Sequence, residues 1–284
     1  TSQTVFPVDM EFPEVTVCNM NPYMQHKRWM NNITEPHTLT ELRLISQELD
    51  ELILETEFNR RPYDNRNSVW RETINRIGKR CYSFQTDERV VIPGPQGGLR
   101  FSALLNQEQY DPFSEEPFVG LRVIVAQPGT PINDELPFAV AKPGKNTMIE
   151  VEKASISRVT RDMWKQCTGE APENSEPRCR ETCINSFIRE TCGCREAGDE
   201  NPDIPHLFET PYCAHVELDD CKTSVVDWDI VVDECDCKPA CKEEKYKIKT
   251  TELDYSLAYL NNYEEQKERE EYSWEDFWAR LGGI

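Results

Sequence analysis

The stretch that decides the fold lies in the second half of the chain, where residues 179–194 read CRETCINSFIRETCGC and residues 235–241 read CDCKPAC. The chain has 12 cysteines, and ten of them fall between Cys167 and Cys241. Secreted domains use cysteines at this density as disulfide staples, whereas cytosolic chains rarely carry so many thiols without a metal. The block therefore predicts an oxidised, extracellular domain.

The spacing of these cysteines predicts two helices that face each other. Cys179 and Cys183 are four residues apart, so they share one side of a helix. Residues 222–234 also have a helical pattern. If the two helices are antiparallel, the nested pairing is Cys183–Cys235, Cys179–Cys237, Cys167–Cys241, Cys192–Cys221 and Cys194–Cys213, with Cys18–Cys81 closing an N-terminal lobe. Geometry favours this ladder, but sequence alone does not fix a connectivity.

Zinc binding is the alternative use of these cysteines. Cys192 and Cys194 form a C-x-C pair, as do Cys235 and Cys237, whereas zinc sites usually have C-x₂₋₄-C spacing. The sequon Asn32-Ile33-Thr34 is usable only in the secretory pathway and agrees with disulfides. We therefore expect disulfides, a glycan at Asn32, and neither a metal nor a cofactor.

Charge and motif content argue against nucleic-acid binding and against an enzyme. The net charge is −20, from 52 acidic and 32 basic residues, and nucleic-acid phosphates would be repelled. The sequence contains no H-E-x-x-H, G-x-S-x-G or P-loop motif. A nucleophilic cysteine beside His206 or His215 is unexpected because the cysteines balance as pairs. We therefore expect no catalytic residues.

The chain also lacks the sequence of a membrane span. Its longest apolar stretch is near residues 121–126, whereas a membrane helix needs roughly 20 apolar residues. No export signal is present, although an oxidised domain must be exported. We therefore expect this chain to be a piece of a longer protein.

The first 80 residues predict a strand followed by a helical lobe. Residues 1–18 are extended in pattern, and their prolines predict a broken or edge strand. Thr38 and Glu41 form a capping box that opens a helix over 38–58. That helix has one apolar stripe, namely Leu42, Ile45, Leu49, Leu52 and Ile53. A second helix is predicted over 68–77, with Gly78 as its stop.

Residues 81–160 predict β-structure. Strands are expected at 100–105, 120–126 and 147–159, separated by Pro-Gly turns at 93–94, 128–129 and 143–144. The pair Gly97-Gly98 is also expected to be a turn, since no Walker context surrounds it. Residues 246–262 begin as an extended segment.

In chain order, the motifs resemble the extracellular domain of the epithelial sodium channel, degenerin and acid-sensing ion channel superfamily. The thumb spacing of that superfamily is matched by Cys179-x₃-Cys183-x₈-Cys192-x-Cys194, by Pro211-Tyr212-Cys213 and by Cys235-x-Cys237-x₃-Cys241. Further segments match in order: FPEVTVCN at 12–19, GKRCYSF at 78–84, GGL at 97–99, GLRV at 120–123, KPG at 142–144 and LGG at 281–283. The nested disulfide ladder agrees with that of the superfamily.

The resemblance implies an α+β fold, with an antiparallel β palm and β-ball core, a peripheral helical finger and a disulfide-stapled helical thumb. The implied parts are the first palm strand at 1–18, the helical finger at 19–80, palm and β-ball strands at 81–163, the thumb at 164–245, a shortened palm return at 246–274 and the start of the second membrane helix at 275–284.

The implied protein is a homo- or heterotrimeric, amiloride-sensitive sodium channel of the plasma membrane. The chain would lie on the extracellular side and be anchored by membrane helices that flank it. Sodium ions would pass through the pore, and protons or a peptide would be candidate ligands. A secreted disulfide-rich binding module or receptor ectodomain is the alternative.

Three residues take roles from the resemblance. Trp164 matches a thumb-loop aromatic that couples the ectodomain to the pore helices, although it also suits ordinary core packing. Asp227 matches an acidic thumb position of proton-gated members, although it also suits a solvated helix face. Ala279 falls near the small residue whose enlargement holds degenerin pores open.

Two departures from the superfamily pattern qualify these roles. A second acid of the proton-sensing pocket is replaced by Thr223, which argues against proton gating. The stretch from Cys241 to Leu281 is shorter than two returning palm strands need.

Overall fold

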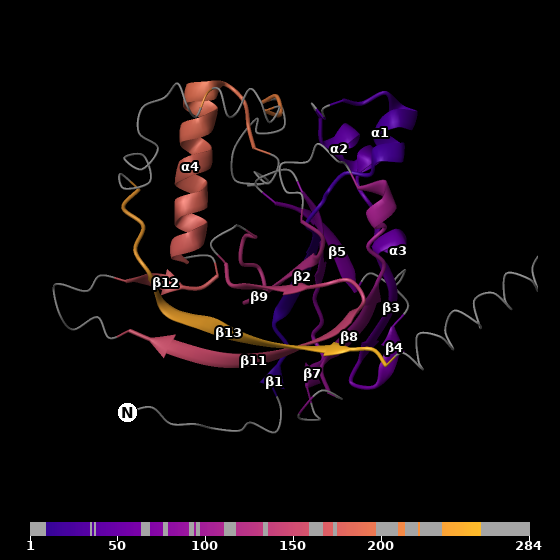
Figure 1. Ribbon diagram of the computed structural model, residues 1–284. Helices are drawn as coiled ribbons and strands as arrows, with labels where there is room; N and C mark the ends of the chain where they lie inside the picture. Colours follow the sequence, from indigo (N-terminus) through magenta and orange to yellow (C-terminus); the bar gives the residue numbers. More distant parts are fainter. Residues whose placement is uncertain are drawn as a thin grey trace, which may run out of the picture.

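The structure of the chain is a computed structural model. It describes residues 10–34, 36, 38–63, 69–75, 79–90, 94, 97–110, 118–132, 136–158, 167–172, 175–196, 210–213, 221 and 235–256. Within this part the chain is α+β, with mostly antiparallel strands and few helices (Figure 1). The predicted α+β class with antiparallel sheets is therefore confirmed.

An antiparallel sheet of five strands forms the centre of the molecule. Its spatial order is β10 (Phe138–Ala141), β9 (Leu121–Ala126), β2 (Glu14–Asn19), β6 (Arg80–Phe84) and β5 (Trp70–Ile74). In β2, Val15 and Val17 pair with residues of both neighbouring strands and are buried, as expected for an internal strand. Cys18 lies directly opposite Cys81 across the β2–β6 pair, and the two form a disulfide.

Two smaller sheets flank the central one. β3 (Ile53–Phe58) pairs antiparallel with β4 (Arg61–Tyr63) and with β8 (Leu99–Ala103). β1 (Met10–Glu11) pairs with β7 (Arg89–Val90).

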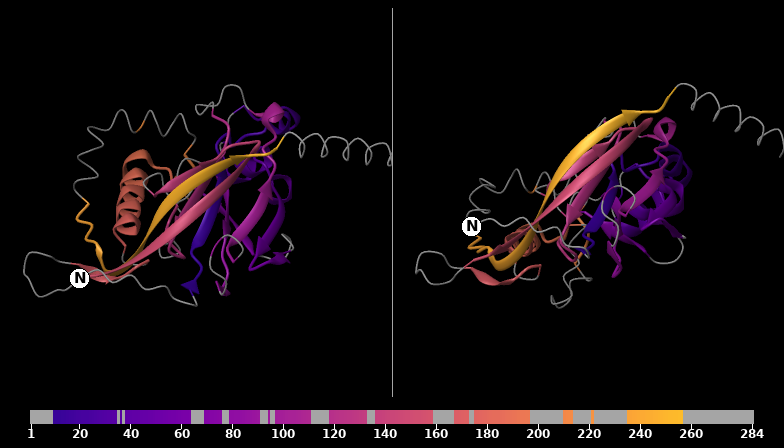
Figure 2. Two further views of the ribbon diagram at one scale, coloured as in Figure 1. Left: turned by 60° about the horizontal axis from the view of Figure 1, so that its bottom comes forward. Right: turned by 90° about the horizontal axis from the view of Figure 1, so that it is seen from below.

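A long ribbon crosses the molecule beside these sheets. It pairs β11 (Lys145–Ser157) antiparallel with β13 (Ala240–Asp254), and β12 (Thr168–Glu170) runs parallel to the start of β13. Figure 2 shows that the ribbon runs from the base of α4 (Glu176–Cys192) to the side of the molecule that carries β3 and β8. β11 and β13 are the longest of the described strands. The ribbon therefore connects the region of α4 with the region of the β4–β3–β8 sheet.

The remaining helices are short and gather at one end of the molecule (Figure 1). They are α1 (Gln25–Asn31), α2 (Leu39–Ile45) and α3 (Leu49–Leu52), with a 3₁₀ turn, η1, at Gln107–Gln109. The capping box at the start of α2 is confirmed: the Thr38 hydroxyl accepts from the Glu41 amide, and the Glu41 carboxylate accepts from the Thr38 amide.

The main core lies between the central sheet and the β4–β3–β8 sheet and is rich in aromatic side chains. Phe58 and Phe84 are both fully buried, and their ring centroids are 5.7 Å apart. Trp70 packs edge-on against Phe84 at 5.4 Å, and its indole N–H donates to the Thr56 hydroxyl at 2.9 Å. Edge-on packing of this kind stabilises aromatic pairs beyond the effect of burial alone.

The single helix predicted over 38–58 is wrong in two places: it is interrupted at residues 46–48, between α2 and α3, and helical structure ends at Leu52. Residues 53–58 form β3 instead, and Ile53, Thr56 and Phe58 are its buried residues. The apolar spacing of three and four residues continues past Leu52, so the pattern alone gives no stop. The pairing of β3 with β8 outweighs helix propensity here.

The helix predicted over 68–77 is also wrong, because Trp70–Ile74 form strand β5. Trp70 and Ile74 are four residues apart and both buried. Residues with this separation share a face in a helix and also in a strand, so the spacing did not discriminate. The lobe predicted as helical over 19–80 therefore contains three short helices and three strands among its described residues.

The β predictions for the middle of the chain are confirmed, with small changes of boundary. Strands β8, β9 and β11 correspond to the expected strands at 100–105, 120–126 and 147–159. Gly94, Gly129 and Gly144 have positive φ, as their Pro-Gly turns require. The N-terminal strand is broken at Pro13, as expected, but β2 is internal rather than at an edge. The extended segment predicted from 246 begins earlier, at Ala240.

Candidate functional site: the junction between the stapled helix and the ribbon

All 12 cysteines form disulfides, and five of the six bonds surround α4. The pairs are Cys18–Cys81, Cys167–Cys241, Cys179–Cys237, Cys183–Cys235, Cys192–Cys221 and Cys194–Cys213, the same pairs as in the nested ladder. No free thiol remains, so the C-x-C pairs are not zinc ligands. The described residues also contain no group of three or more His, Cys, Asp or Glu side chains arranged for a metal.

Helix α4 begins and ends with clear capping signals. The Ser175 hydroxyl accepts from the Arg178 amide at its start, and Gly193 takes a left-handed conformation, with φ of 67°, at its end. Cys179 and Cys183 lie on the side of the helix that is bonded to residues 235–237. Two disulfides therefore fix α4 to the segment that leads directly into β13.

The C-terminal end of α4 is linked by two disulfides to Cys213 and Cys221. Cys192–Cys221 and Cys194–Cys213 lie at this end, and the Arg195 and Cys213 amides donate to Pro211 and Arg195 carbonyls at 2.9 Å. Tyr212, beside Cys213, packs against a small cluster that contains Leu42 of α2 and Ile74 of β5. The segment that is linked to the end of α4 by Cys194–Cys213 therefore contacts the N-terminal lobe.

Near the start of α4, the segment that leads into this helix meets the ribbon at a compact polar junction. We define the junction as Gln127, Arg158, Cys167, Cys241 and Glu243. The Arg158 amide donates to the Cys241 carbonyl at 2.8 Å, while the Cys241 sulfur is bonded to Cys167. The guanidinium of Arg158 donates to the Ala240 carbonyl and forms an ion pair with Glu243 at 2.5 Å. The Glu243 side chain is only 10% exposed, so this pair is well shielded from water.

Gln127 joins the central sheet to the same place. It follows β9, and its side-chain amide donates to the Ala171 carbonyl at 3.2 Å and accepts from the Glu244 amide at 3.4 Å. One side chain thus contacts both β13 and the loop after β12. The central sheet, the ribbon and the loop that leads from β12 to α4 therefore meet at the junction.

The ribbon continues from the junction into the main core. Tyr246 of β13 is 8% exposed and belongs to the aromatic cluster, and its hydroxyl donates to the Glu244 carboxylate at 3.0 Å. Burial, together with the charge of Glu244 and this hydrogen bond, raises the pKa of Tyr246 above its ordinary value. The tyrosine therefore stays neutral and anchors β13 against the core.

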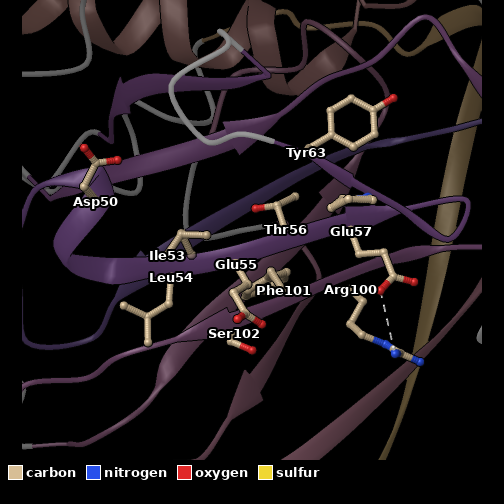
Figure 3. Close-up of a pocket in the computed structure, with 11 residues that line it drawn as sticks. Asp50, Ile53, Leu54, Glu55, Thr56, Glu57, Tyr63, Arg100, Phe101 and Ser102 are labelled. Carbon is tan, nitrogen blue, oxygen red and sulfur yellow. Dashed lines mark ion pairs between the residues drawn. The ribbon is translucent and has the colours of Figure 1, made fainter. Parts of the chain in front are cut away.

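A pocket of about 690 Å³ opens on the β4–β3–β8 sheet, away from the junction (Figure 3). Leu54, Glu55 and Ser102 are among its lining residues, and Arg100 lies 4.0 Å from Glu57 in an ion pair. The lining carries three acids and one base, so it is net negative. Among the site residues expected from the sequence that the structure describes, none lines this pocket.

The functional class of this arrangement is set by comparison with known proteins. A sequence model of the family described as amiloride-sensitive sodium channel matches residues 26–284. The chain belongs to this family. The family consists of ion channels rather than enzymes, in line with the absence of catalytic motifs.

Curated relatives in the sodium channel family include two fish proteins and a nematode protein. The chain is 24% identical to acid-sensing ion channel 1A of Danio rerio over 84% of its length, and 25% identical to acid-sensing ion channel 2 of the same species over 90%. It is 24% identical to degenerin-like protein unc-105 of Caenorhabditis elegans over 72% of its length. The chain spans about 57% of each fish protein and 25% of the nematode protein. Among its described helices, none is both long and apolar enough to cross a bilayer.

The three residues that take family roles, Trp164, Asp227 and Ala279, lie outside the described residues, as does the whole predicted helix at 222–234. Arg158 and Cys167 lie before and after the segment that contains Trp164. Both are bonded to Cys241, Arg158 by a backbone hydrogen bond and Cys167 by a disulfide. Asn32 is described and is exposed at the end of α1.

Sequence reasoning missed Gln127, Arg158 and the contact of Tyr212 with the lobe. Gln127 had a usable signal: it is a polar residue at the end of an apolar strand and just before a Pro-Gly turn. Arg158 was read as part of a strand. Its partners are 82 and 85 residues away in the sequence, so no local pattern could reveal them.

Proposed function

We propose that this chain is the extracellular part of a sodium channel subunit and that it couples an extracellular stimulus to the opening of a pore. The match of the family model over residues 26–284 carries the proposal. The six disulfides support an extracellular location, because such bonds persist in oxidising compartments. The proposed assembly is a homo- or heterotrimer of related subunits in the plasma membrane, and the proposed blocker is amiloride.

The proposed moving part is the stapled helix. Disulfides at both ends of α4 resist its deformation, so a displacement would move it as one body. One end is linked through Cys194–Cys213 to the segment whose Tyr212 contacts the N-terminal lobe, and the other end is bonded to residues 235–237, which lead into β13. A movement between the lobe and the helix would therefore pull on the ribbon. In family terms, we propose that α4 belongs to the thumb, the central sheet and ribbon to the palm, and α1–α3 to the finger.

We propose that Trp164 passes this movement toward the membrane. The residues on either side of its segment, Arg158 and Cys167, are held together at Cys241, so the segment would move with the junction. Asp227 is proposed to face the stimulus, and Ala279 to lie near the pore. The domain limits expected from the sequence remain proposals, with the finger range 19–80 now known to include β3, β4 and β5.

Protons and a basic peptide are the proposed stimuli, supported by the net charge of −20. The described groups with shifted pKa values do not favour a proton sensor near neutral pH. Burial raises the pKa of Tyr63 and of Tyr110 to about 12, and hydrogen bonds from basic side chains lower the pKa of Glu51 and of Glu72 despite their burial. A peptide is therefore the better supported of the two.

The test is electrical recording from the complete protein that carries this chain, expressed in cells alone and with a related subunit. We expect a sodium current that amiloride blocks and that acid, a basic peptide or stretch evokes. Absence of current under every stimulus, with the protein present at the surface, would favour the alternative of a binding module or receptor ectodomain.

A pair of variants tests the junction itself. Arg158→Gln removes the shielded ion pair with Glu243 and should weaken or abolish the evoked current while surface labelling stays normal. Lys142→Gln removes an ion pair of 3.0 Å with Glu252 at the other end of the ribbon and serves as the matched control. Equal currents in the two variants would contradict coupling through the junction.

A further inference from the structure

We propose that Asn32 carries an N-linked glycan whose first sugars cover the indole ring of Trp29. The proposal rests on the proposed extracellular location, because only the secretory pathway supplies the sugar donor. Asn32-Ile33-Thr34 is the one Asn-x-Ser/Thr sequence in the chain. The sequence motif makes attachment chemically possible, and the surroundings of Asn32 decide whether its side chain is accessible.

Asn32 ends helix α1 in a conformation that leaves it accessible. Its φ of 52° and ψ of 39° are left-handed, and its amide donates to the Trp29 carbonyl at 3.2 Å. Asparagine tolerates this conformation better than most residues and ends helices in this way. Both Asn32 and Thr34 are exposed, while Ile33 between them is partly buried.

The turn that contains the sequon is held in place by Arg28. The guanidinium of Arg28 donates to the carbonyls of Ile33 and Thr34, and the Ile33 amide donates back to the Arg28 carbonyl at 3.0 Å. These hydrogen bonds involve the backbone of the turn and the side chain of Arg28. The side-chain amide of Asn32 takes no part in them, and Asn32 is exposed. A glycan attached there would start from a fixed point beside α1.

Trp29, close to Asn32 in the sequence, is an unusually exposed aromatic residue. It is 89% exposed, and its neighbour Met30 is 77% exposed, the two highest values among the large hydrophobic residues of the described chain. Adjacent apolar side chains with this exposure favour association with other surfaces. Trp29 lies about one helical turn before Asn32. Sugar rings present C–H faces that pack on aromatic rings, so a glycan at Asn32 is a suitable cover for the indole.

Covalent attachment makes this contact favourable although each sugar–indole contact is weak. A glycan tethered three residues away is held near the ring at a high effective concentration. The proposed occupant is therefore this chain's own glycan.

The modification is a simple substitution. The side-chain amide nitrogen of Asn32 attacks the anomeric carbon of an oligosaccharide carried on a lipid pyrophosphate. A carbon–nitrogen bond forms while the anomeric carbon–oxygen bond to phosphate breaks. The lipid pyrophosphate leaves with that electron pair, the amide loses one proton, and no oxidant or reductant is needed.

The attachment is tested by mass spectrometry of the complete protein made in secretory cells, before and after treatment with a peptide-N-glycosidase. We expect a glycan on the peptide that contains Asn32. It should be lost in Asn32→Gln and in Thr34→Val, and retained in the control Thr40→Val, which changes an exposed threonine of α2 outside the sequon. An unmodified Asn32 overturns the proposal. The disulfide state of the same sample then shows whether the proposed location fails with it, since free thiols would contradict both.

The cover over Trp29 is tested by hydroxyl-radical footprinting of the wild type and of Asn32→Gln. Oxidation of Trp29 should be several-fold slower in the glycosylated wild type than in the variant. Oxidation of Trp70, which is 5% exposed, should be equally slow in both and serves as the internal control. Equal oxidation of Trp29 in the two proteins would overturn the proposed contact even if the glycan is present.

Discussion

The two sides of this molecule are held together by different forces. On one side, residues 167–241 carry five disulfides and a small buried cluster of Ile184, Ile188, Cys194 and Cys213. The sheets on the other side share one disulfide, Cys18–Cys81, and a large core of aromatic and aliphatic side chains. We call these the stapled side and the sheet side.

The difference follows from how much apolar surface each side can bury. A small core supplies little stabilisation, so small extracellular units depend on covalent links. The sheet side buries enough apolar surface to hold itself together. The stapled side is therefore suited to move as a rigid unit, while the sheet side is suited to serve as its support.

The largest expected effect comes from breaking the core of the sheet side. Phe58→Ala removes a fully buried ring that lies 4.8 Å from Phe12 and 5.7 Å from Phe84. We expect the free energy of unfolding to fall by about 3–5 kcal/mol in urea denaturation, because a cavity replaces the ring. The control is Phe118→Ala, at a position that is 61% exposed, where the change should stay within about 0.5 kcal/mol. Similar losses in both variants would mean that this cluster does not stabilise the sheet side.

The second prediction breaks the stapled side in the same way. Replacing Cys183 and Cys235 together by serine opens a loop with a sequence separation of 52 residues. The expected loss is about 2–4 kcal/mol, mainly through the greater freedom of the unfolded chain. Hydrogen exchange should accelerate in α4 while β2 and β9 keep their protection. Equal acceleration in all three elements would contradict the division into two sides.

The third prediction concerns close packing in the central sheet. A Cβ atom on Gly120 would lie 2.9 Å from Val140 Cγ1 and 3.3 Å from the Ala141 carbonyl oxygen. Gly120→Ala should therefore cost about 1–3 kcal/mol of unfolding free energy. Gly98→Ala is the control, because a Cβ there meets no atom within 4 Å and the backbone needs no positive φ. Should the two substitutions have equal effects on the urea midpoint, tight packing at β9–β10 would not limit the sheet side.

The same division explains which features could be predicted from the sequence. On the stapled side, Cys179 and Cys183 mark a helix by their spacing, and covalent pairing leaves a direct record in the residue types. The capping box of Thr38 and Glu41 is another local signal, and it marked the start of α2 correctly. Local chemistry of this kind can be read without knowing the fold.

On the sheet side, the deciding interactions join different segments of the chain. Ile53–Phe58 form a strand because they pair with β8, 41–50 residues later. Trp70–Ile74 form a strand because they pair with β6, 6–14 residues later. Apolar residues four apart fit a helix and a strand equally, so only the partner strand separates the two. The junction has the same character, because Gln127 and Arg158 gain their roles from contacts with β13.

The smallest expected effect is the pH dependence of stability that the ion pairs of Glu72 give to the sheet side. Glu72 of β5 accepts from Arg43 of α2 at 2.5 Å and from Arg80 of β6 at 2.6 Å. Burial alone would raise the pKa of Glu72, but these hydrogen bonds outweigh it and hold the pKa below the ordinary value of 4.5. A lowered pKa in the folded state gives stability that is present above pH 4.5 and is lost as the pH falls through the folded value.

Glu72→Gln should therefore lower the urea midpoint at pH 7, by an amount equivalent to less than about 1 kcal/mol because the group is partly exposed. The gap between variant and wild type should close as the pH is lowered below 4.5. Glu57→Gln is the control, since Glu57 forms only a long ion pair of 4.0 Å with Arg100. A gap for Glu72→Gln that persists in acid would mean that its charge is not what ties α2 to the sheet. At any one pH, the protection of the α4 amides against hydrogen exchange should be the same in Glu72→Gln and in the wild type, because the disulfides that hold that helix do not titrate.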